Sequence, residues 1–268
     1  MTSKFSRITI RNRSIAMAET AKPTQLRPQT AEAFDAYIHK AEAATEQALH
    51  AGGPFLWFDL SSERTQQVQK GQVVVQCLAG RAPVEVPSGL IHDWTGAAWI
   101  CGTTVEDTLA LIQDYDNHKN IYKPEVIASR LISHHDNDFQ IYLRLLKKKI
   151  ITVVLDTDHE VHYRSLDPSR WVCRSYTTRI AEVQDAGSSK ERVLLPDIGY
   201  GFLWRLFSYW RFQERDGGVY VECRAISLTR DLPSGLGWAI KAIIGKVPKE
   251  SLTRTLQTTR QALQANKR

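Results

Sequence analysis

Residues 202–214, FLWRLFSYWRFQE, and residues 219–229, VYVECRAISLT, are joined by the short polar segment RDGG at 215–218. Both long segments are rich in aromatic and β-branched residues, which is typical of strands, and an Asp-Gly pair between them is typical of a tight hairpin turn. Because side chains alternate along a strand, one apolar face of this hairpin carries Trp204, Leu206, Ser208, Trp210, Phe212, Val221, Cys223 and Ala225. The stretch therefore predicts an antiparallel hairpin with one apolar, aromatic-rich face.

Four segments upstream have the same texture, at residues 126–133, 139–146, 150–162 and 171–183. The connections between them carry Asn, Asp, Pro and Ser, which are residues typical of turns. A further strand is expected at about 91–101. The sequence therefore predicts about seven antiparallel strands, with no long helix between Pro124 and the end of the last strand.

Helices are predicted on both sides of these strands. Thr103 or Thr104 caps a helix whose buried stripe is Val105, Leu109, Ile112 and Tyr115, and a short second helix at 116–122 ends before Pro124. A long C-terminal helix begins at about residue 234 and is kinked or restarted at Pro248. Its apolar residues are Trp238, Ile240, Ile243, Ile244, Val247, Leu252, Leu256 and Leu263.

The N-terminal third has a different character. Residues 1–29 contain Pro23 and Pro28 and no amphipathic period, so we expect a disordered extension there. Residues 30–87 are expected to form a helical extension with a short strand that packs on the main domain, with Thr30 as the cap of a helix ending near His50. The main domain is expected at residues 88–265.

The order of a strand, a helix pair, six antiparallel strands and a long C-terminal helix resembles the START-like superfamily, also called SRPBCC, which includes polyketide cyclases and lipid-transfer domains. Residues 104–118, TVEDTLALIQDYDNH, and residues 209–223, YWRFQERDGGVYVEC, resemble segments of such domains. The resemblance covers about residues 88–265. It implies an α+β helix-grip fold, in which a curved antiparallel sheet of about seven strands wraps around the C-terminal helix.

A curled sheet that grips one helix leaves an apolar tunnel between them. We expect this tunnel to hold a lipid, an isoprenoid or a polyketide-like molecule, so that the protein carries or senses a hydrophobic compound. Its mouth is expected between residues 116–124 and 184–201. The expected ligand-binding residues are Tyr115, Tyr122, Tyr176, Trp204, Leu206, Ser208, Trp210, Phe212, Val221, Cys223, Ala225, Trp238 and Ile243.

The alternative is an enzyme of the cyclase or aromatase type, in which a polar group inside the tunnel polarises a carbonyl or moves a proton. The candidate groups are Tyr163, Arg174, Tyr176 and Ser208. No nucleophile elbow, phosphate-binding loop, dinucleotide fingerprint or HExxH motif occurs in the sequence. The pattern thus favours a carrier or sensor over an enzyme, and the catalytic residues of the alternative stay unassigned.

Two groups of residues could be taken for metal sites. Asp156, Asp158, Glu160 and His162 share one face of a predicted strand, and a polar, solvated face explains them more simply. The cysteines at 77, 101, 173 and 223 are too far apart for a zinc ribbon, and the last three are expected to be buried, reduced thiols. We therefore expect no metal and no cofactor.

The net charge of +6 does not indicate a nucleic-acid partner, because four basic residues precede the first acid, Glu19, and the rest of the chain carries only +2. Lys147 to Lys149 are expected to reach into water at a strand end, with transient contact to a membrane surface as the alternative. No apolar run approaches the roughly 18 residues of a membrane span. As written, the chain has no signal peptide and is expected in the cytoplasm, unless an upstream signal was lost; a start at Met1 or Met17 and the oligomeric state stay open.

Overall fold

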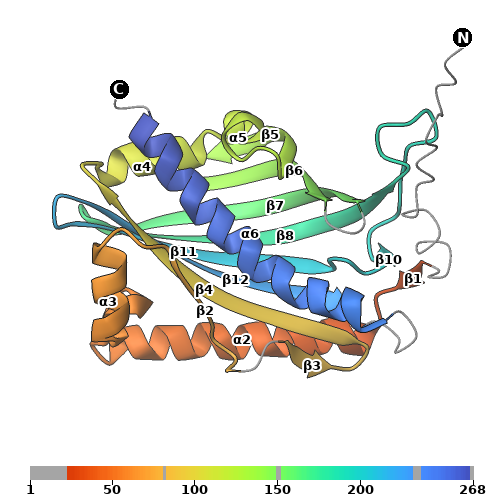
Figure 1. The fold of residues 1–268 in the computed structure, drawn as a ribbon, viewed down its shortest axis with the longest axis horizontal. Helices are drawn as coiled ribbons and strands as arrows, with labels where there is room; N and C mark the ends of the chain where they lie inside the picture. Colours follow the sequence, from red (N-terminus) through yellow and green to blue (C-terminus); the bar gives the residue numbers. More distant parts are fainter. Residues whose placement is uncertain (1–22, 81–82, 149–151, 232–236, 266–268) are drawn as a thin grey trace, which may run out of the picture.

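The computed structural model describes residues 23–80, 83–148, 152–231 and 237–265, with the backbone alone for 237–245. Its main feature is a ten-stranded sheet in which β2-β4-β12-β11-β8-β7-β6-β5 lie in that order and all neighbours are antiparallel. Helix α6 (Gly237–Ala265) crosses one face of this sheet diagonally (Figure 1). The seven long strands are β4 (Gly89–Cys101), β5 (Val126–His135), β6 (Asp138–Lys148), β7 (Thr152–Asp167), β8 (Arg170–Gln184), β11 (Arg205–Arg215) and β12 (Gly218–Arg230).

Short strands complete the sheet at its margins. β2 (Val74–Cys77) and β3 (Val84–Val86) pair with β4, and β9 (Arg192–Val193) pairs with β8. A separate small sheet joins β1 (Thr24–Gln25) to β10 (Ile198–Gly199). The α+β helix-grip fold expected from the sequence is thus confirmed, with the six strands after Pro124 and the long helix in their expected order.

The β11–β12 turn shows how local chemistry sets the register. Arg215 pairs with Gly218, and the two residues between them, Asp216 and Gly217, have φ angles of 56° and 71°. This left-handed pair is the backbone of the tight hairpin turn that matches strand twist, and Asp-Gly adopts it readily. The turn places Ser208 opposite Ala225 and Trp210 opposite Cys223 on one side of the sheet.

A helix pair lies between β4 and β5, as predicted. Helix α4 (Val105–Gln113) begins after Thr104, whose side chain accepts a hydrogen bond from the Asp107 backbone N–H at 3.1 Å. The 3-10 turn η2 (Tyr115–Asn117) and helix α5 (His118–Ile121) follow. Val105, Leu109, Ile112 and Tyr115 are all buried, so the predicted stripe of this helix is confirmed.

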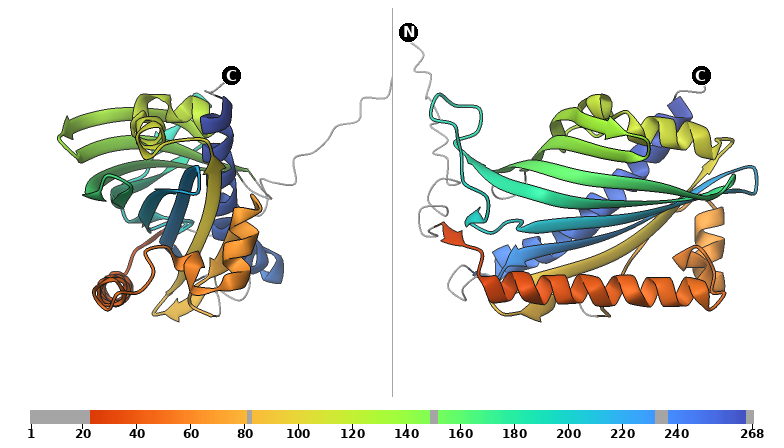
Figure 2. Two further views of the ribbon diagram at one scale, coloured as in Figure 1. Left: turned by 90° about the vertical axis from the view of Figure 1, so that its left-hand side faces the viewer. Right: turned by 180° about the vertical axis from the view of Figure 1, so that it is seen from behind.

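Helix α2 (Pro28–His50) runs along the face of the sheet opposite to α6; the left view of Figure 2 shows α2 end-on, with strands between it and α6. It begins three residues earlier than predicted, because Pro28 occupies the first turn and Arg27, not Thr30, is the cap. Thr30, the expected cap, instead donates its hydroxyl to the carbonyl of Pro87 at 2.6 Å.

The expectation that residues 1–29 are a disordered extension is wrong for its last part. Thr24 and Gln25 form β1, and Leu26 is buried between α2 and the sheet. An apolar side chain and the partner strand β10, distant in sequence, hold this segment, and neither was visible in a local pattern. Residues 1–22 lie outside the described residues.

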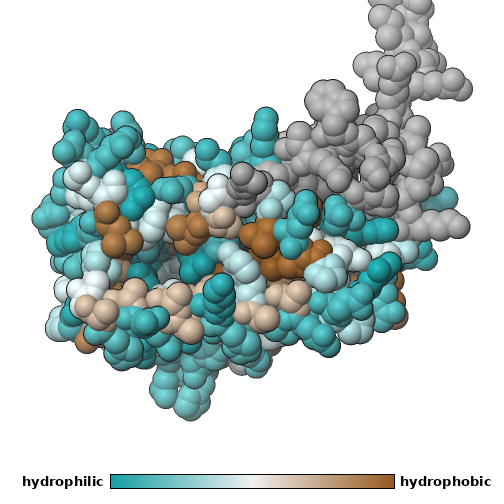
Figure 3. Space-filling model, turned by 90° about the horizontal axis from the view of Figure 1, so that it is seen from below, coloured by the Kyte–Doolittle hydropathy of each residue, from teal (hydrophilic) through white to brown (hydrophobic). Residues whose placement is uncertain are grey.

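The contact between α2 and the sheet is apolar at its centre. Phe34 has no exposed surface, and its ring meets that of Phe207 edge-on at a centroid distance of 5.3 Å. The buried residues of this cluster are Leu26, Phe34, Ile38, Ala41, Ile91, Trp204, Ile226 and Leu228. Seen from below, the remaining hydrophobic groups lie in separate patches among hydrophilic side chains (Figure 3).

A second part of the N-terminal segment covers the sheet beyond the end of α2. The 3-10 turn η1 (Trp57–Leu60) and helix α3 (Ser62–Gln69) bury Phe55, Leu56 and Phe58 against β12. The buried carboxylate of Glu222 accepts a hydrogen bond from the Trp57 backbone N–H at 2.6 Å. The segment is therefore tied to the sheet by apolar contacts and by a buried polar one.

Two of the cysteines are buried as expected, and one is not. Cys173 and Cys223 are buried on the inner face of the sheet. Cys101 is exposed, because it is the last residue of β4, next to the turn at Gly102. All four are free thiols. Among the described helices, none is long and apolar enough to span a membrane.

Candidate functional site

A cavity of about 380 Å³ lies between the inner face of the sheet, the α4–α5 pair and helix α6. This volume is within the range of roughly 300–1,000 Å³ that is usual for small-molecule sites. Strands β6, β7, β8, β11 and β12 form the curved wall, and α6 contributes residues 247–258. The apolar side chains of the wall are Ile112, Val126, Ile141, Leu143, Leu145, Val153, Leu155, Val161, Phe202, Leu203, Leu206, Trp210, Ala225, Val247 and Leu252.

Seven of the thirteen residues expected to bind a ligand line this cavity: Tyr115, Tyr122, Leu206, Ser208, Trp210, Cys223 and Ala225. Strict alternation in β11 and β12 brings the five strand residues to one face, and η2 and α5 bring in the two tyrosines. Trp210 and Ser208 also contact each other, because the indole Nε1–H donates to the Ser208 hydroxyl at 3.2 Å.

Of the other six expected residues, three are placed outside the cavity by their position in or near β11 and β12. Phe212 and Val221 are buried on the inner side, but beyond the end of the cavity, where they join the core formed with α4. Trp204 lies in a bend before β11, so the alternation of that strand does not apply to it, and it packs against α2 on the outer face. The side chains of Trp238 and Ile243 lie outside the described residues.

Tyr176 points away from the cavity, and so does its neighbour Arg174. The Tyr176 hydroxyl donates to Glu42 of α2 at 2.7 Å, and Arg174 donates to Glu46 of α2 at 3.0 Å. The cause is a β-bulge, since Asp158 pairs with Arg179 but His159 pairs with Thr177, which leaves one extra residue in β8. The bulge reverses the faces of β8, so Tyr176 does not share a face with Ile180 as strict alternation predicts.

Sequence reasoning missed much of the cavity wall. Ile141, Leu143 and Leu145 alternate along β6, and this signal could have placed them on the inner face. His118 and His159 also line the cavity. Alternation along β7 already puts His159 on the face opposite Asp156 and His162, whereas no pattern around His118 indicated its position.

Several polar groups that line the cavity have partners within the protein. The hydroxyls of Tyr115 and Tyr163 are 2.8 Å apart, and Nε2 of His118 is 2.9 Å from the Ile112 carbonyl oxygen. Glu125 and Lys147 form an ion pair at 2.6 Å, so Lys147 is paired rather than free in water. Each of the four groups suggested for a cyclase, Tyr163, Arg174, Tyr176 and Ser208, therefore either points away from the cavity or has a protein partner.

The expected mouth is built differently on its two sides. Residues 116–124 contribute His118 and Tyr122 to the cavity, whereas no residue of 184–201 lines it. The loop 184–201 is instead held close to β8, because the Glu182 carboxylate accepts hydrogen bonds from the backbone N–H groups of Tyr200 and Gly201 at 2.7 and 2.9 Å. Phe202 and Leu203, directly after the loop, do line the cavity.

The polar face of β7 is explained by contacts between side chains. Asp156 pairs with Arg144 at 2.7 Å and accepts a hydrogen bond from Tyr142, and Arg144 holds the pKa of this carboxyl below its usual value against the effect of burial. His162 contacts Asp138 at 2.7 Å. Within the described residues, no three His, Cys, Asp or Glu side chains gather as a metal site would require.

Burial keeps three histidines neutral. His92, His118 and His159 are buried, and loss of hydration lowers the pKa of each imidazole to about 4. In the unfolded chain these side chains have a pKa of about 6.5. The unfolded state therefore binds protons between about pH 6.5 and 4 that the folded state does not.

We expect the free energy of unfolding to fall by several kcal/mol as the pH is lowered through this window. Each histidine contributes about 1.4 kcal/mol for each unit by which its pKa is lowered on folding. Glu222 has the opposite effect between about pH 4.5 and 7, since burial raises its pKa to about 7. The fall should thus be steeper in Glu222→Gln. Urea unfolding at several pH values measures both chains, and constant stability of Glu222→Gln on acidification would show that the histidines are not neutral and buried.

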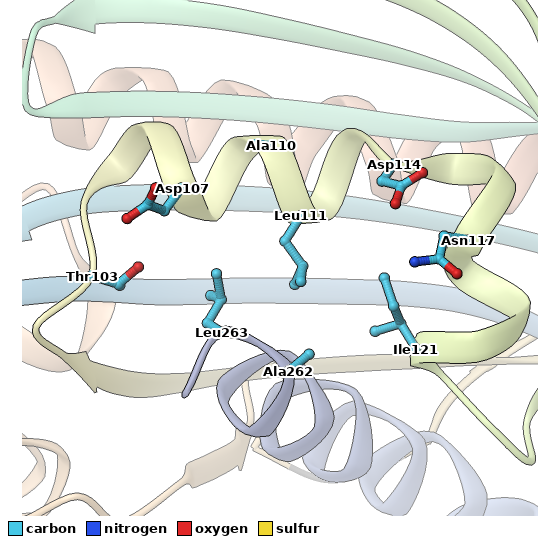
Figure 4. Close-up of a pocket in the computed structure, with 9 residues that line it drawn as sticks. All are labelled: Thr103, Asp107, Ala110, Leu111, Asp114, Asn117, Ile121, Ala262 and Leu263. Atoms are coloured by element: carbon cyan, nitrogen blue, oxygen red, sulfur yellow. The ribbon is translucent and has the colours of Figure 1, made fainter. Parts of the chain in front are cut away.

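A second hollow of about 370 Å³ lies outside the cavity, between α4–α5 and the end of α6. Leu111 and Ile121 face Ala262 and Leu263 across it, and polar residues flank it (Figure 4). Four of its nine lining residues are polar, namely Thr103, Asp107, Asp114 and Asn117. It offers an apolar molecule much less contact than the cavity does.

No protein-family model and no curated protein matches the sequence. Among solved structures, the chain is similar to the STAR-related lipid transfer protein from Xanthomonas axonopodis, with 16% identity over 68% of this chain and 98% of that chain and a TM-score of 0.46. It is similar to the Zhui aromatase/cyclase from Streptomyces sp. R1128, with 10% identity over 66% and 96% and a TM-score of 0.47. A human lipid transfer and protein localization domain shows 7% identity over 77% and 98%, with a TM-score of 0.41.

These likenesses concern the fold alone. The strand order of the sheet and the diagonal course of α6 define an α+β helix-grip fold from this chain's own features. The cavity that this fold encloses is the candidate functional site.

Proposed function

We propose that this protein binds a hydrophobic small molecule, such as a lipid, an isoprenoid or a polyketide-like compound, in the cavity beneath α6, and that it carries or senses this molecule. The observation that supports this most is the cavity itself, whose wall is mostly apolar and several of whose polar groups are hydrogen-bonded within the protein. Water in such a space makes few hydrogen bonds, so an apolar molecule replaces it favourably.

The alternative of a cyclase-type enzyme has less support. Such an enzyme needs a polar group that meets the substrate inside the cavity. Arg174 and Tyr176 are bound to α2 on the other face of the sheet, and Tyr163 is paired with Tyr115. Binding without chemistry therefore agrees better with the arrangement of these side chains.

The proposal predicts one saturable site for a hydrophobic, environment-sensitive dye, with a large rise in fluorescence on binding. Organic extraction of the purified protein should also release an apolar compound, which displaces the dye when it is added back. Protein that yields no such compound and leaves the dye fluorescence unchanged would contradict the proposal.

A further inference from the structure

Three polar groups in the cavity wall already donate their hydrogen bonds to other groups of the protein. Nε2 of His118 lies 2.9 Å from the carbonyl oxygen of Ile112, and a carbonyl oxygen can only accept a hydrogen bond. Nε2 therefore carries the hydrogen, and in a neutral imidazole the other nitrogen, Nδ1, then has only a lone pair.

His159 is fixed in the same tautomer by a relay of two hydrogen bonds. The Thr157 hydroxyl donates its proton to the carbonyl of Leu143 at 3.0 Å. It can thus only accept from Nε2 of His159, which lies 2.9 Å away. Nδ1 of His159 is left as an acceptor, and the Ser175 hydroxyl is 3.5 Å from it, longer than a good hydrogen bond.

Tyr122 shows the same pattern on the α5 side of the cavity. Thr259 of α6 donates its hydroxyl to the carbonyl of Thr255 at 2.9 Å, so it accepts from the Tyr122 hydroxyl at 3.1 Å. The oxygen of Tyr122 keeps lone pairs only. His118, His159 and Tyr122 all line the cavity, so the wall presents acceptors whose own protons are used elsewhere.

Burial keeps these acceptors in place. His118 and His159 are 7% and 6% exposed, and loss of hydration lowers the pKa of both imidazoles to about 4, so they are neutral near pH 7. A buried acceptor without a donor costs free energy, and a ligand that brings the donor recovers it. A ligand that brings only lone pairs recovers nothing at this place.

We propose that the ligand of the cavity is an apolar molecule with a hydroxyl group, and that this hydroxyl donates its hydrogen bond to Nδ1 of His159. This inference rests on the proposed function and names its ligand class. Ser208 is the cross-strand partner of Ser175, which lies beside His159. Ser208 accepts from Trp210 and keeps its own proton, so an alcohol, which both donates and accepts, matches this pair of groups.

Two compounds of the same chain length test the inference in the dye-displacement assay: dodecan-1-ol and its methyl ether. Both are neutral and have one oxygen, but only the alcohol can donate a hydrogen bond. We expect the alcohol to bind roughly tenfold more tightly, as for one well-made buried hydrogen bond. Equal affinities, or a tighter ether, would overturn the inference while leaving the proposed function intact, whereas failure of both compounds to displace the dye would count against the proposed function.

A pair of matched variants locates the acceptor. His159→Phe should bring the affinity ratio of alcohol to ether close to one, because a phenyl ring cannot accept this hydrogen bond. His162→Phe makes the same change on the outer face of the same strand, where the side chain is exposed, and should keep the wild-type ratio. A wild-type ratio in folded His159→Phe would overturn the assignment.

A second measurement on the wild-type protein does not depend on that variant folding. The ¹⁵N resonance of the unprotonated ring nitrogen of His159 should shift when dodecan-1-ol is added, because that nitrogen accepts the new hydrogen bond. The ether should leave the resonance unchanged. A shift of equal size with both compounds, or with neither, would contradict a hydrogen bond to Nδ1.

Discussion

Replacing Ala225 with phenylalanine is expected to abolish binding of the hydrophobic dye, with a loss of affinity on the order of 100-fold or more. Ala225 lies on the cavity wall in β12, opposite Ser208 of β11 and Trp94 of β4. A phenyl ring at this position would extend into the cavity and occupy the space of the ligand. Because that space is already empty of protein atoms, the larger side chain should cost less stability than overpacking of a filled core.

The matched control is Ala110→Phe, which fills the second hollow instead of the cavity. Ala110 lies on an exposed position of α4 and lines that hollow only. This variant should bind the dye as the wild-type protein does. If Ala225→Phe binds normally, or if Ala110→Phe loses binding, the ligand does not occupy the cavity beneath α6.

Phe34→Ala is expected to destabilise the protein by about 3–5 kcal/mol. The Phe34 side chain has no exposed surface and packs edge-on against Phe207 between α2 and the outer face of the sheet. Its removal would leave a cavity that α2 cannot close without breaking the hydrogen bonds of Glu42 with Tyr176 and Tyr209. Urea unfolding, followed by circular dichroism, measures the loss.

His39→Ala serves as the control, because His39 is exposed on the same helix, and we expect a change within about 0.5 kcal/mol. A result for Phe34→Ala as small as that of the control would mean that α2 is not part of the cooperative fold. The N-terminal segment would then be an appendage rather than the cover of the outer face.

The sequence was sufficient for the fold because its strongest signals are local. The Arg215–Gly218 turn, the cap at Thr104 and the alternation along β11 and β12 each depend on residues close in the chain, and the structure has all three. The five strand residues of the predicted site that line the cavity come from this hairpin. Alternation was reliable there because the two strands pair without a register shift.

The errors arose where the structure depends on residues far apart in sequence. Tyr176 was placed on the wrong face because a bulge in β8 is a property of its pairing with β7. Trp204 was assigned to a strand that begins one residue later. The order of residues 24–29 was missed, because Leu26 becomes buried only when α2 and the sheet meet.

Native mass spectrometry of wild-type protein and Ala225→Phe, purified from the same host in parallel, compares the two cavities directly. We expect the wild-type protein to carry an additional mass that organic solvent removes, and Ala225→Phe to show the mass of the polypeptide alone. Wild-type protein without any additional mass that also binds no added apolar compound would contradict a ligand-binding cavity. So would an identical adduct on both proteins, because the compound would then be held elsewhere.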